Sequence, residues 1–208
     1  PDGVMGAELI DQMRQQAERF GTQFVRGDIR RVDLSRRPFV LHLEGDKTIT
    51  AQTLIISTGA SARWLGLESE TKLRLSGGGV SACATCDGAF YRGKEVHVVG
   101  GGDTAMEEAT FLTRFCTKVT IIHRRDSLRA SRIMQQRAFE NEKIEFLWNS
   151  EVADILAGDD GKIRALKIRD TRTGELCEVA IQGLFIAIGH TPNTAFLEGQ
   201  LETDEHGF

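Results

Sequence analysis

A glycine-rich loop between a short apolar strand and a helix is the strongest constraint on how this chain can fold. The letters GGGDTA at residues 100–105 follow the apolar run 95–99 and open a helical pattern at 103–115. A second strand pattern follows at 118–123, within about 30 residues of the first. A G-x-G-x-x-A spacing in this context predicts a βαβ unit that binds a dinucleotide. The alternative is a glycine-rich turn in an ordinary α/β unit.

Each residue of this loop has a physical task in such a unit. Gly100 permits the tight turn, Gly102 lets the backbone approach a pyrophosphate, and Ala105 keeps helix and strand close. The helix that opens at Asp103 and Thr104 presents unpaired N–H groups and the positive end of its dipole to phosphate. The sequence therefore predicts that these five residues bind the cofactor.

A basic segment stands where the second strand ends. His123, Arg124 and Arg125 follow one another directly, and Arg129 comes four residues later. Sites selective for NADH carry Asp or Glu at this point, because a carboxylate bonds the ribose 2′-hydroxyl. Arginines instead bind a 2′-phosphate, with bidentate geometry available. We therefore expect NADPH as the cofactor, although a solvated basic loop is the simpler alternative.

Two cysteines lie three residues apart, as Cys83 and Cys86 in the segment CATCDG. This spacing suits a redox-active disulfide or half of a zinc site. Zinc would need two more ligands, and the sequence has no second CxxC or His pair, so we expect no metal. Two inert thiols are a further alternative. Asp87 directly follows the second cysteine, where a carboxylate can shuttle a proton when a thiolate forms or leaves.

The remaining patterns complete an α/β chain. We expect helices at 7–20 and 131–141, an irregular segment at 62–79, and surface positions for His42, His97 and His206. Short apolar runs bounded by turn residues predict the strands. These runs are 23–25, 29–34, 39–43, 48–50, 54–57, 144–148, 152–157, 165–170, 177–181 and 184–188.

Composition excludes several classes of protein. The chain has 208 residues and a formal net charge of -4, which gives no electrostatic case for nucleic acid. No apolar run approaches the roughly 18 residues that span a bilayer, so we expect no membrane partner. Sparse cysteines, one CxxC and NADPH use favour a reducing, cytoplasmic location.

Five segments, taken together, resemble one family. Residues 58–63, 81–88, 100–105, 123–126 and 189–194 occur in this order in low-molecular-weight thioredoxin reductases, of the bacterial and plant type. Essentially the whole chain takes part in the resemblance. Any single motif is weak evidence, whereas their joint occurrence is highly specific.

The resemblance implies a homodimeric flavoprotein oxidoreductase in which electrons pass from NADPH to FAD, then to a disulfide, then to thioredoxin. Carried onto this chain, Cys83 and Cys86 form the redox pair and Asp87 is the acid–base residue. Thr104, His123 and the three arginines would hold NADPH.

The resemblance also assigns FAD contacts and domains. Thr58 and Gly59 would lie against FAD, and the backbone near Ile29 would lie near its adenine. The family's fold is a Rossmann-like NADPH-binding domain inserted in an FAD-binding domain. Residues 1–62 would be a partial FAD-binding domain, 63–187 the NADPH-binding domain with the CxxC, and 188–208 an incomplete return into the FAD-binding domain. We expect an internal fragment, because no strand with a GxGxxG loop precedes residue 1 and no closing flavin segment follows residue 208.

Two other functions remain open from the sequence. One is a disulfide reductase of the peroxide system, of the alkyl hydroperoxide reductase type, although the Ala84-Thr85 pair between the cysteines fits thioredoxin reductase better. The other is a non-catalytic, NADPH-binding redox module. The resemblance further implies that the inserted domain rotates about crossing strands near 63–66 and 186–190.

Overall fold

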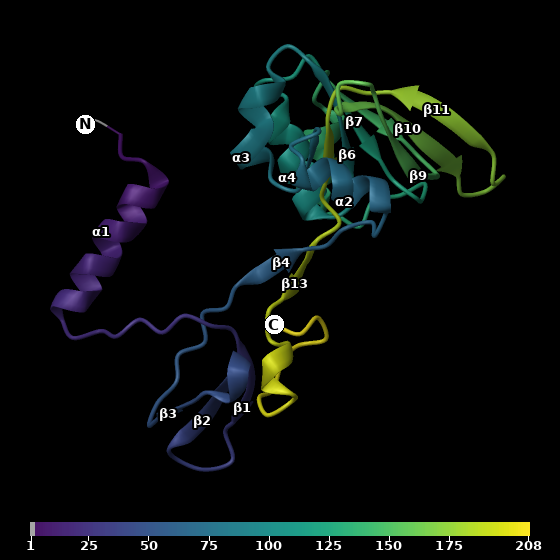
Figure 1. Ribbon diagram of the computed structural model, residues 1–208. Coiled ribbons are helices and arrows are strands. Elements are labelled where there is room, and N and C mark those ends of the chain that lie inside the picture. Colours follow the sequence, from purple (N-terminus) through teal and green to yellow (C-terminus); the bar gives the residue numbers. More distant parts are fainter. Residues whose placement is uncertain (1–2) are drawn as a thin grey trace. The chain divides into compact units, whose positions relative to one another are not determined.

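The computed structural model describes residues 3–208, which form two compact units (Figure 1). The first unit takes the described residues up to Ser57 together with Thr194–His206. The second unit is Thr58–Asn193, so it is inserted within the chain of the first. The second unit extends beyond the expected domain, 63–187, at both ends. It does so because the antiparallel pair of strands β4 (Ala60–Ala62) and β13 (His190–Pro192) belongs to it.

A parallel sheet forms the centre of the second unit. Its five strands run in the order β5-β12-β6-β7-β8, and every neighbouring pair is parallel. This order places β6 between two partners and brings the end of β12 beside the glycine-rich loop. The α/β class predicted from the sequence is confirmed. The strands are β5 (Val80–Ser81), β6 (Glu95–Val99), β7 (Lys118–Ile122), β8 (Ile144–Leu147) and β12 (Leu184–Ile186).

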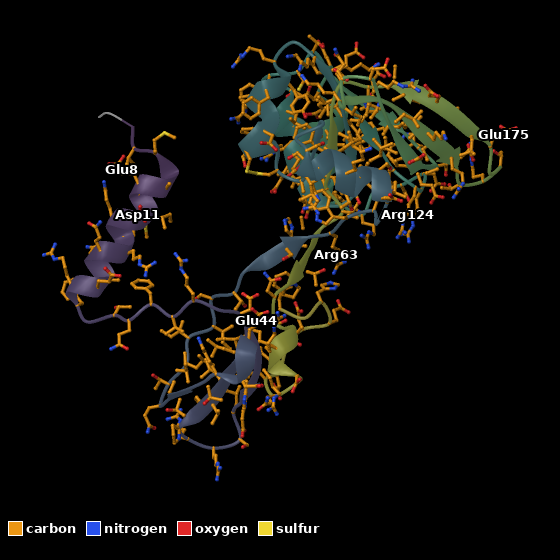
Figure 2. All side chains as sticks on the ribbon, viewed as in Figure 1. Glu8, Asp11, Glu44, Arg63, Arg124 and Glu175 are labelled. Atoms are coloured by element: carbon orange, nitrogen blue, oxygen red, sulfur yellow. A yellow bond between two sulfur atoms is a disulfide. The ribbon has the colours of Figure 1, made fainter. Side chains whose placement is uncertain are left out.

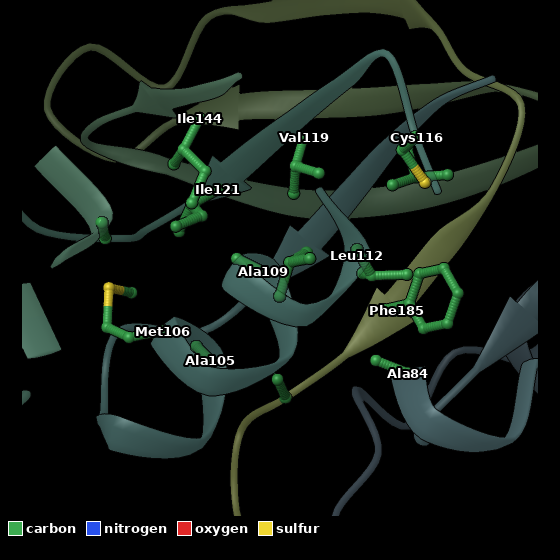
Figure 3. Packing of buried hydrophobic residues seen from close by; sticks show 14 of the residues in the cluster. Ala84, Ala105, Met106, Ala109, Leu112, Cys116, Val119, Ile121, Ile144 and Phe185 are labelled. Carbon is green, nitrogen blue, oxygen red and sulfur yellow. The ribbon is translucent and has the colours of Figure 1, made fainter. Parts of the chain in front are cut away.

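Helices α4 (Asp103–Leu112) and α5 (Arg132–Phe139) share an apolar cluster with the parallel sheet. Ala105, Ala109 and Leu112 of α4 are fully buried there, against valines and isoleucines of β6 and β7 (Figure 3). These three positions repeat with helical spacing, which is the amphipathic pattern that predicts the helix. Small alanines on α4 let the helix lie close to the sheet.

An antiparallel sheet supplies the second apolar cluster of this unit. It consists of β9 (Ser150–Ala157), β10 (Ile163–Asp170) and β11 (Leu176–Ala180), in the order β11-β10-β9. Its buried residues pack in one cluster with Val99 and Ile122 of the parallel sheet. Since Val96 and Val98 belong to the cluster with α4, alternate residues of β6 are buried on its two faces.

This double burial corrects the expectation for His97. The prediction from sequence placed its ring at the surface. The residue is only 6% exposed, however, and its Nδ1 has no hydrogen-bond partner. Burial and, to a smaller extent, the nearby Lys118 charge lower the pKa of His97 to about 4, so the ring is neutral at pH 7. A strand whose two faces are both covered buries whatever residue stands at its centre.

The segment 62–79 is not irregular throughout, because it contains helix α2 (Glu68–Leu75). Glu70 is buried in this helix, and its two carboxylate oxygens accept the N–H groups of Leu65 and Gly66, each at 2.9 Å. The incoming chain is thereby fixed to the first turn of the helix. Further on, the cysteine segment forms the short helices α3 (Ala84–Asp87) and η2 (Gly88–Tyr91).

The first unit is smaller and more open. Helix α1 (Gly6–Arg19) buries none of its residues. The predicted meander is confirmed as β1 (Ile29–Asp33), β2 (Phe39–Leu43) and β3 (Thr48–Ala51), paired antiparallel. Its core contains buried residues of β1 and β2 together with Leu197, next to the single turns η1 (Glu44–Asp46) and η3 (Ala195–Leu197).

Two expected strands of this unit are wrong. Residues 23–25 and 54–57 have no strand partner among residues 3–208, and Ile55 is 89% exposed. A β-rich apolar run forms a strand only where a second strand supplies hydrogen bonds. Among the same described residues, no helix has both the length and the apolar character needed to cross a bilayer.

A substitution of Phe185 in β12 tests how much the main apolar cluster stabilises the fold. Its ring is fully buried and meets Tyr91 edge-on at 5.2 Å between centroids. We expect Phe185→Ala to lower the free energy of unfolding by about 3–5 kcal/mol, because it leaves a cavity. Phe90→Ala is the matched control, since Phe90 is 75% exposed. Equal urea midpoints for the two variants would contradict this packing.

Candidate functional site

The loop that joins β6 to α4 depends on missing side chains. A Cβ on Gly100 would overlap the carbonyl oxygen of Ala187 and stand 2.6 Å from the Cβ of Ala105. A Cβ on Gly101 would overlap the ring of His123. Ala105 itself is fully buried, so it packs the helix against the strand as predicted and lies away from the cavity described below.

Gly102 has the opposite surroundings. No atom lies within 4 Å of the place where its Cβ would stand, and it is the N-cap residue of α4. No side chain caps this helix end, so its first N–H groups remain available to an anion. Asp103 faces elsewhere, because its Oδ1 accepts the N–H of Ser131 at 2.7 Å at the start of α5. This side chain therefore has a structural partner, and the contact of Asp103 with a cofactor stays a prediction.

A cavity of about 790 Å³ opens in front of this loop. It brings together most of the residues that the sequence assigned to a dinucleotide: Gly100, Gly102, Thr104, His123, Arg124, Arg125 and Arg129. The cavity is also lined by Arg63 and Arg169, which were not predicted from the sequence to bind the dinucleotide (Figure 2 labels Arg63 and Arg124). Such a volume, with glycines at one wall and cations at another, suits a large anionic ligand.

The arginine-bearing segment is tied to the glycine loop through the backbone. The N–H groups of Arg129 and Ala130 both donate to the carbonyl oxygen of Gly101, at 2.8 and 3.1 Å. The side chains of Arg124, Arg125 and Arg129 remain exposed. The loop and the cationic group therefore keep a fixed spacing, as a ligand with two separated phosphates requires.

His123 supports this arrangement from beneath. It is buried, and its Nε2 donates to the carbonyl oxygen of Ser127 at 3.0 Å. Burial lowers the pKa of His123, and the charges of Arg125 and Arg124 act in the same direction. The neutral ring packs against Gly101 and supports the backbone of the loop. We therefore infer that His123 shapes the site.

The two arginines that were missed have partners beside the cavity. The Nε of Arg63 donates to Thr191 Oγ1 at 3.0 Å, and Arg169 pairs with Glu151 at 2.9 Å. Their signal in the sequence is weak, because both are single basic residues on strands or strand ends. Only the order of the strands in the fold brings them to the glycine loop.

The cysteine pair forms a disulfide between Cys83 and Cys86, with 5.3 Å between the Cα atoms. Cys86 is exposed and Cys83 is half-buried. The N–H of Cys86 donates to the Sγ of Cys83 at 3.2 Å, and the hydroxyl of Thr85 lies 3.4 Å from the same sulfur. Hydrogen bonds to a sulfur favour its thiolate once the disulfide is opened.

Asp87 ends the short helix that carries the disulfide. Its backbone N–H donates to the carbonyl oxygen of Cys83 at 3.1 Å, and its side chain is half-buried. Burial raises the pKa of Tyr91, and the charge of Asp87 raises it further, so this carboxylate acts on the groups around it.

Among residues 3–208, no three His, Cys, Asp or Glu side chains gather as a metal site would require.

Glu108 of α4 is a half-buried residue that belongs to no sequence motif. Burial raises its pKa to about 7, against a smaller lowering by the backbone N–H of Ala84. Its Oε2 is buried without a hydrogen-bond partner. Ala84 directly follows Cys83, so this carboxyl lies against the helix that carries the disulfide.

The three residues predicted to contact a flavin form no common site within either unit. Ile29 lies at the start of β1 in the first unit, while Thr58 and Gly59 begin the second. All three are exposed. Asn193 donates to the carbonyl oxygens of Thr58 and Gly59, both at 2.9 Å, which closes the antiparallel pair β4–β13.

A glycine cradle that faces an arginine-lined cavity, with a CxxC disulfide in the same unit, defines an α/β protein of dinucleotide-linked disulfide chemistry. The family model for pyridine nucleotide-disulphide oxidoreductases matches residues 6–208, and the chain belongs to this family.

Individual relatives agree with that assignment. The chain is 51% identical over 207 residues to thioredoxin reductase of Streptomyces coelicolor, covering 100% of this chain and 63% of the relative. It is 46% identical to thioredoxin reductase 2 of Arabidopsis thaliana, covering 55% of that protein. The chain thus spans less than two thirds of the length of these relatives.

Solved structures lead to the same comparison. Thioredoxin reductase of Giardia duodenalis superposes with a TM-score of 0.81 at 40% identity, covering 99% of this chain and 66% of the other. That of Lactococcus lactis gives 0.76 at 42% identity, with the same two coverages. The resemblance read from the five sequence segments is therefore confirmed.

Two glycines of one loop make a matched pair for a stability test. We expect Gly100→Ala to destabilise the protein by about 1–3 kcal/mol, because its Cβ has no room beside Ala187 and Ala105. Gly102→Ala should leave the unfolding curve within about 0.5 kcal/mol of the parent, since its surroundings are open. Urea denaturation of both variants measures this. Equal losses would contradict the geometry of the loop.

The raised pKa of Glu108 predicts a pH dependence of stability. Between its ordinary value of 4.5 and about 7, the folded protein holds a proton that the unfolded chain has released, so stability falls as pH rises through this window. Glu108→Gln should remove that dependence, and its advantage over the parent should grow from pH 5 to pH 8. Glu107→Gln, on the exposed side of the same helix, is the control. Parallel stability curves for parent and Glu108→Gln would contradict the prediction.

Proposed function

We propose that this chain carries the NADPH and disulfide chemistry of an NADPH-dependent thioredoxin-disulfide reductase. The observation that supports it is the arginine-lined cavity in front of a glycine cradle, in the same unit as the Cys83–Cys86 disulfide. The thioredoxin reductases of Streptomyces coelicolor and Arabidopsis thaliana name the substrate of the proposal.

The residues of the cavity fit NADPH. The open backbone at Gly102 and the free N–H groups that begin α4 would take the pyrophosphate. Arg124, Arg125 and Arg129 would take the 2′-phosphate, which NADH lacks. Thr104 lines the same cavity and would hydrogen-bond the ligand beside the pyrophosphate. NADPH would supply a hydride, that is, two electrons and a proton.

FAD belongs to the proposal as the electron carrier between the nicotinamide and the disulfide. The pyrophosphate cradle at Gly102 and the start of α4 is assigned to NADPH. Ile29, Thr58 and Gly59 form no enclosed site within either unit. Their role as flavin contacts rests on the resemblance alone, as does the assignment of 1–62 and 188–208 to an FAD-binding domain.

The disulfide chemistry uses residues of one short helix. Opening the Cys83–Cys86 bond takes two electrons and two protons and leaves two thiols. One thiolate then attacks the disulfide of thioredoxin, breaks it and forms a mixed disulfide. The second cysteine attacks this mixed disulfide, so the Cys83–Cys86 bond re-forms and thioredoxin leaves as a dithiol with the two electrons and two protons. The half-buried carboxylate of Asp87 would hold and return a proton in these steps. Homodimerisation, a cytoplasmic location and rotation of the inserted domain complete the proposal.

The direct test is turnover of the full-length protein with NADPH and thioredoxin, followed as the loss of absorbance at the NADPH band. We expect Cys83→Ser and Cys86→Ser each to abolish thioredoxin reduction while NADPH still binds. The visible spectrum of the same sample reports flavin and its bleaching by NADPH. Unchanged turnover in either serine variant would refute the role of the disulfide.

Substitution of the arginines that line the cavity is expected to weaken the binding of NADPH but not that of NADH. Replacing Arg124 or Arg125 by alanine should weaken NADPH binding about tenfold each, because a charge-assisted hydrogen bond contributes about 1.5–3 kcal/mol. NADH binding should stay the same, since it has no 2′-phosphate. Arg164→Ala is the control, as this exposed arginine pairs with Glu178 and lies outside the cavity. Isothermal titration gives both constants, and an equal loss for NADPH and NADH would contradict the assignment.

A further inference from the structure

One carboxylate stands in the wall of an otherwise cationic cavity. Among residues 3–208, the residues that line the cavity include five arginines, and Glu151 is the only acidic residue with them. A carboxylate repels a phosphate that binds beside it, and the repulsion is stronger where water is partly excluded. Glu151 therefore works against the ligand that the arginines suit, unless a neighbouring cation holds it.

Arg169 is that cation. It stands on β10 directly opposite Glu151 on β9, and its Nη1 donates to Glu151 Oε1 at 2.9 Å. The side chains of Arg169 and Glu151 are 48% and 43% exposed, so water screens the pair and opening it costs little. A phosphate carries more negative charge than a carboxylate and can accept two N–H groups of one guanidinium. A phosphate in the cavity can therefore compete with Glu151 for Arg169.

Backbone contacts place this ion pair beside the arginine-bearing segment. The N–H of Ser150, next to the pair on β9, donates to the carbonyl oxygen of His123 at 2.9 Å. The hydroxyl of Thr171, which follows β10, donates to the carbonyl oxygen of Arg124 at 3.1 Å. Both strands are thus fixed to the segment that the proposed function assigns to the 2′-phosphate of NADPH.

We propose that Arg169 is a further residue that binds the 2′-phosphate, and that Glu151 is an internal competitor that holds the Arg169 guanidinium when no phosphate is bound. When the dinucleotide binds, its 2′-phosphate takes the place of the Glu151 carboxylate on the guanidinium. Glu151 thereby keeps the affinity for NADPH below the value that the arginines alone would give. The inference deepens the proposed function, because it rests on the assignment of this cavity to NADPH.

The test is isothermal titration of the whole chain with NADP⁺ and with NAD⁺. We expect Glu151→Gln to bind NADP⁺ about threefold more tightly than the parent, because the competing charge is gone. Its binding of NAD⁺, which has no 2′-phosphate, should stay the same. A gain in affinity cannot arise from partial unfolding of the variant. Glu178→Gln is the matched control and should bind both dinucleotides like the parent, since Glu178 pairs with Arg164 in the same antiparallel sheet but outside the cavity.

A double variant decides whether Arg169 binds the phosphate or only neutralises Glu151. Arg169→Ala alone should weaken NADP⁺ binding about tenfold, because it removes a charge-assisted contact and leaves the carboxylate without its partner. If Arg169 only neutralised Glu151, the double variant Glu151→Gln/Arg169→Ala would bind NADP⁺ at least as tightly as the parent. Because we assign Arg169 to the phosphate, we expect the double variant to bind about fivefold more weakly than the parent.

Three outcomes would overturn the proposal alone. These are NADP⁺ binding by Glu151→Gln equal to the parent's, a double variant that binds as tightly as the parent, and an equal gain for NADP⁺ and NAD⁺ in Glu151→Gln. The last would place the contact at the pyrophosphate, which both dinucleotides share. In each of these cases the parent still binds NADP⁺, so the proposed function stands. A parent that does not bind NADP⁺ would instead refute the proposed function and this inference together.

Discussion

The close approach of three backbone segments at Gly100 is the constraint on which the site depends. Strand β6 ends there, the residue after β12 presents the Ala187 carbonyl oxygen, and Ala105 of α4 packs from the third side. A single methyl group at Gly100 would separate these segments. Their contact sets the direction of α4, and that direction brings the free N–H groups of its first turn to the edge of the cavity.

Helix α4 borders both candidate sites. Its first turn borders the arginine-lined cavity, while its buried face carries the disulfide helix through Ala84 and Gly88. The glycine cradle and the disulfide helix therefore both contact α4, although their proposed roles differ: the cradle would bind a large anion, and the disulfide would present a sulfur to a partner. Because both sites contact the same helix, the distance between them stays constant as long as the unit is folded.

The sequence predicted the parts of the fold that have a local cause. The glycine loop, the α4 pattern and the β1–β3 meander each follow from spacing and turn residues, and the CxxC pairing follows from proximity. The failures concern residues whose state is decided by distant partners. The apolar run at 54–57 is as strand-like as the run at 95–99, yet only the latter has partner strands. His97 is polar, yet it is buried because both faces of its strand are covered. Arg63, Arg169 and Glu108 have no motif at all, and only the fold brings them to the site.

The most direct test of the account is to observe which amides respond to the dinucleotide. In a titration of the isotopically labelled chain with NADP⁺, followed by amide chemical shifts, we expect the largest changes at Gly101–Ala105 and at the backbone of residues 124–129. Residues of the first unit should stay unchanged at ligand concentrations that saturate these shifts. Shifts that cluster elsewhere in the second unit, or a loop that does not respond to saturating NADP⁺, would contradict the claim that this glycine cradle binds the cofactor.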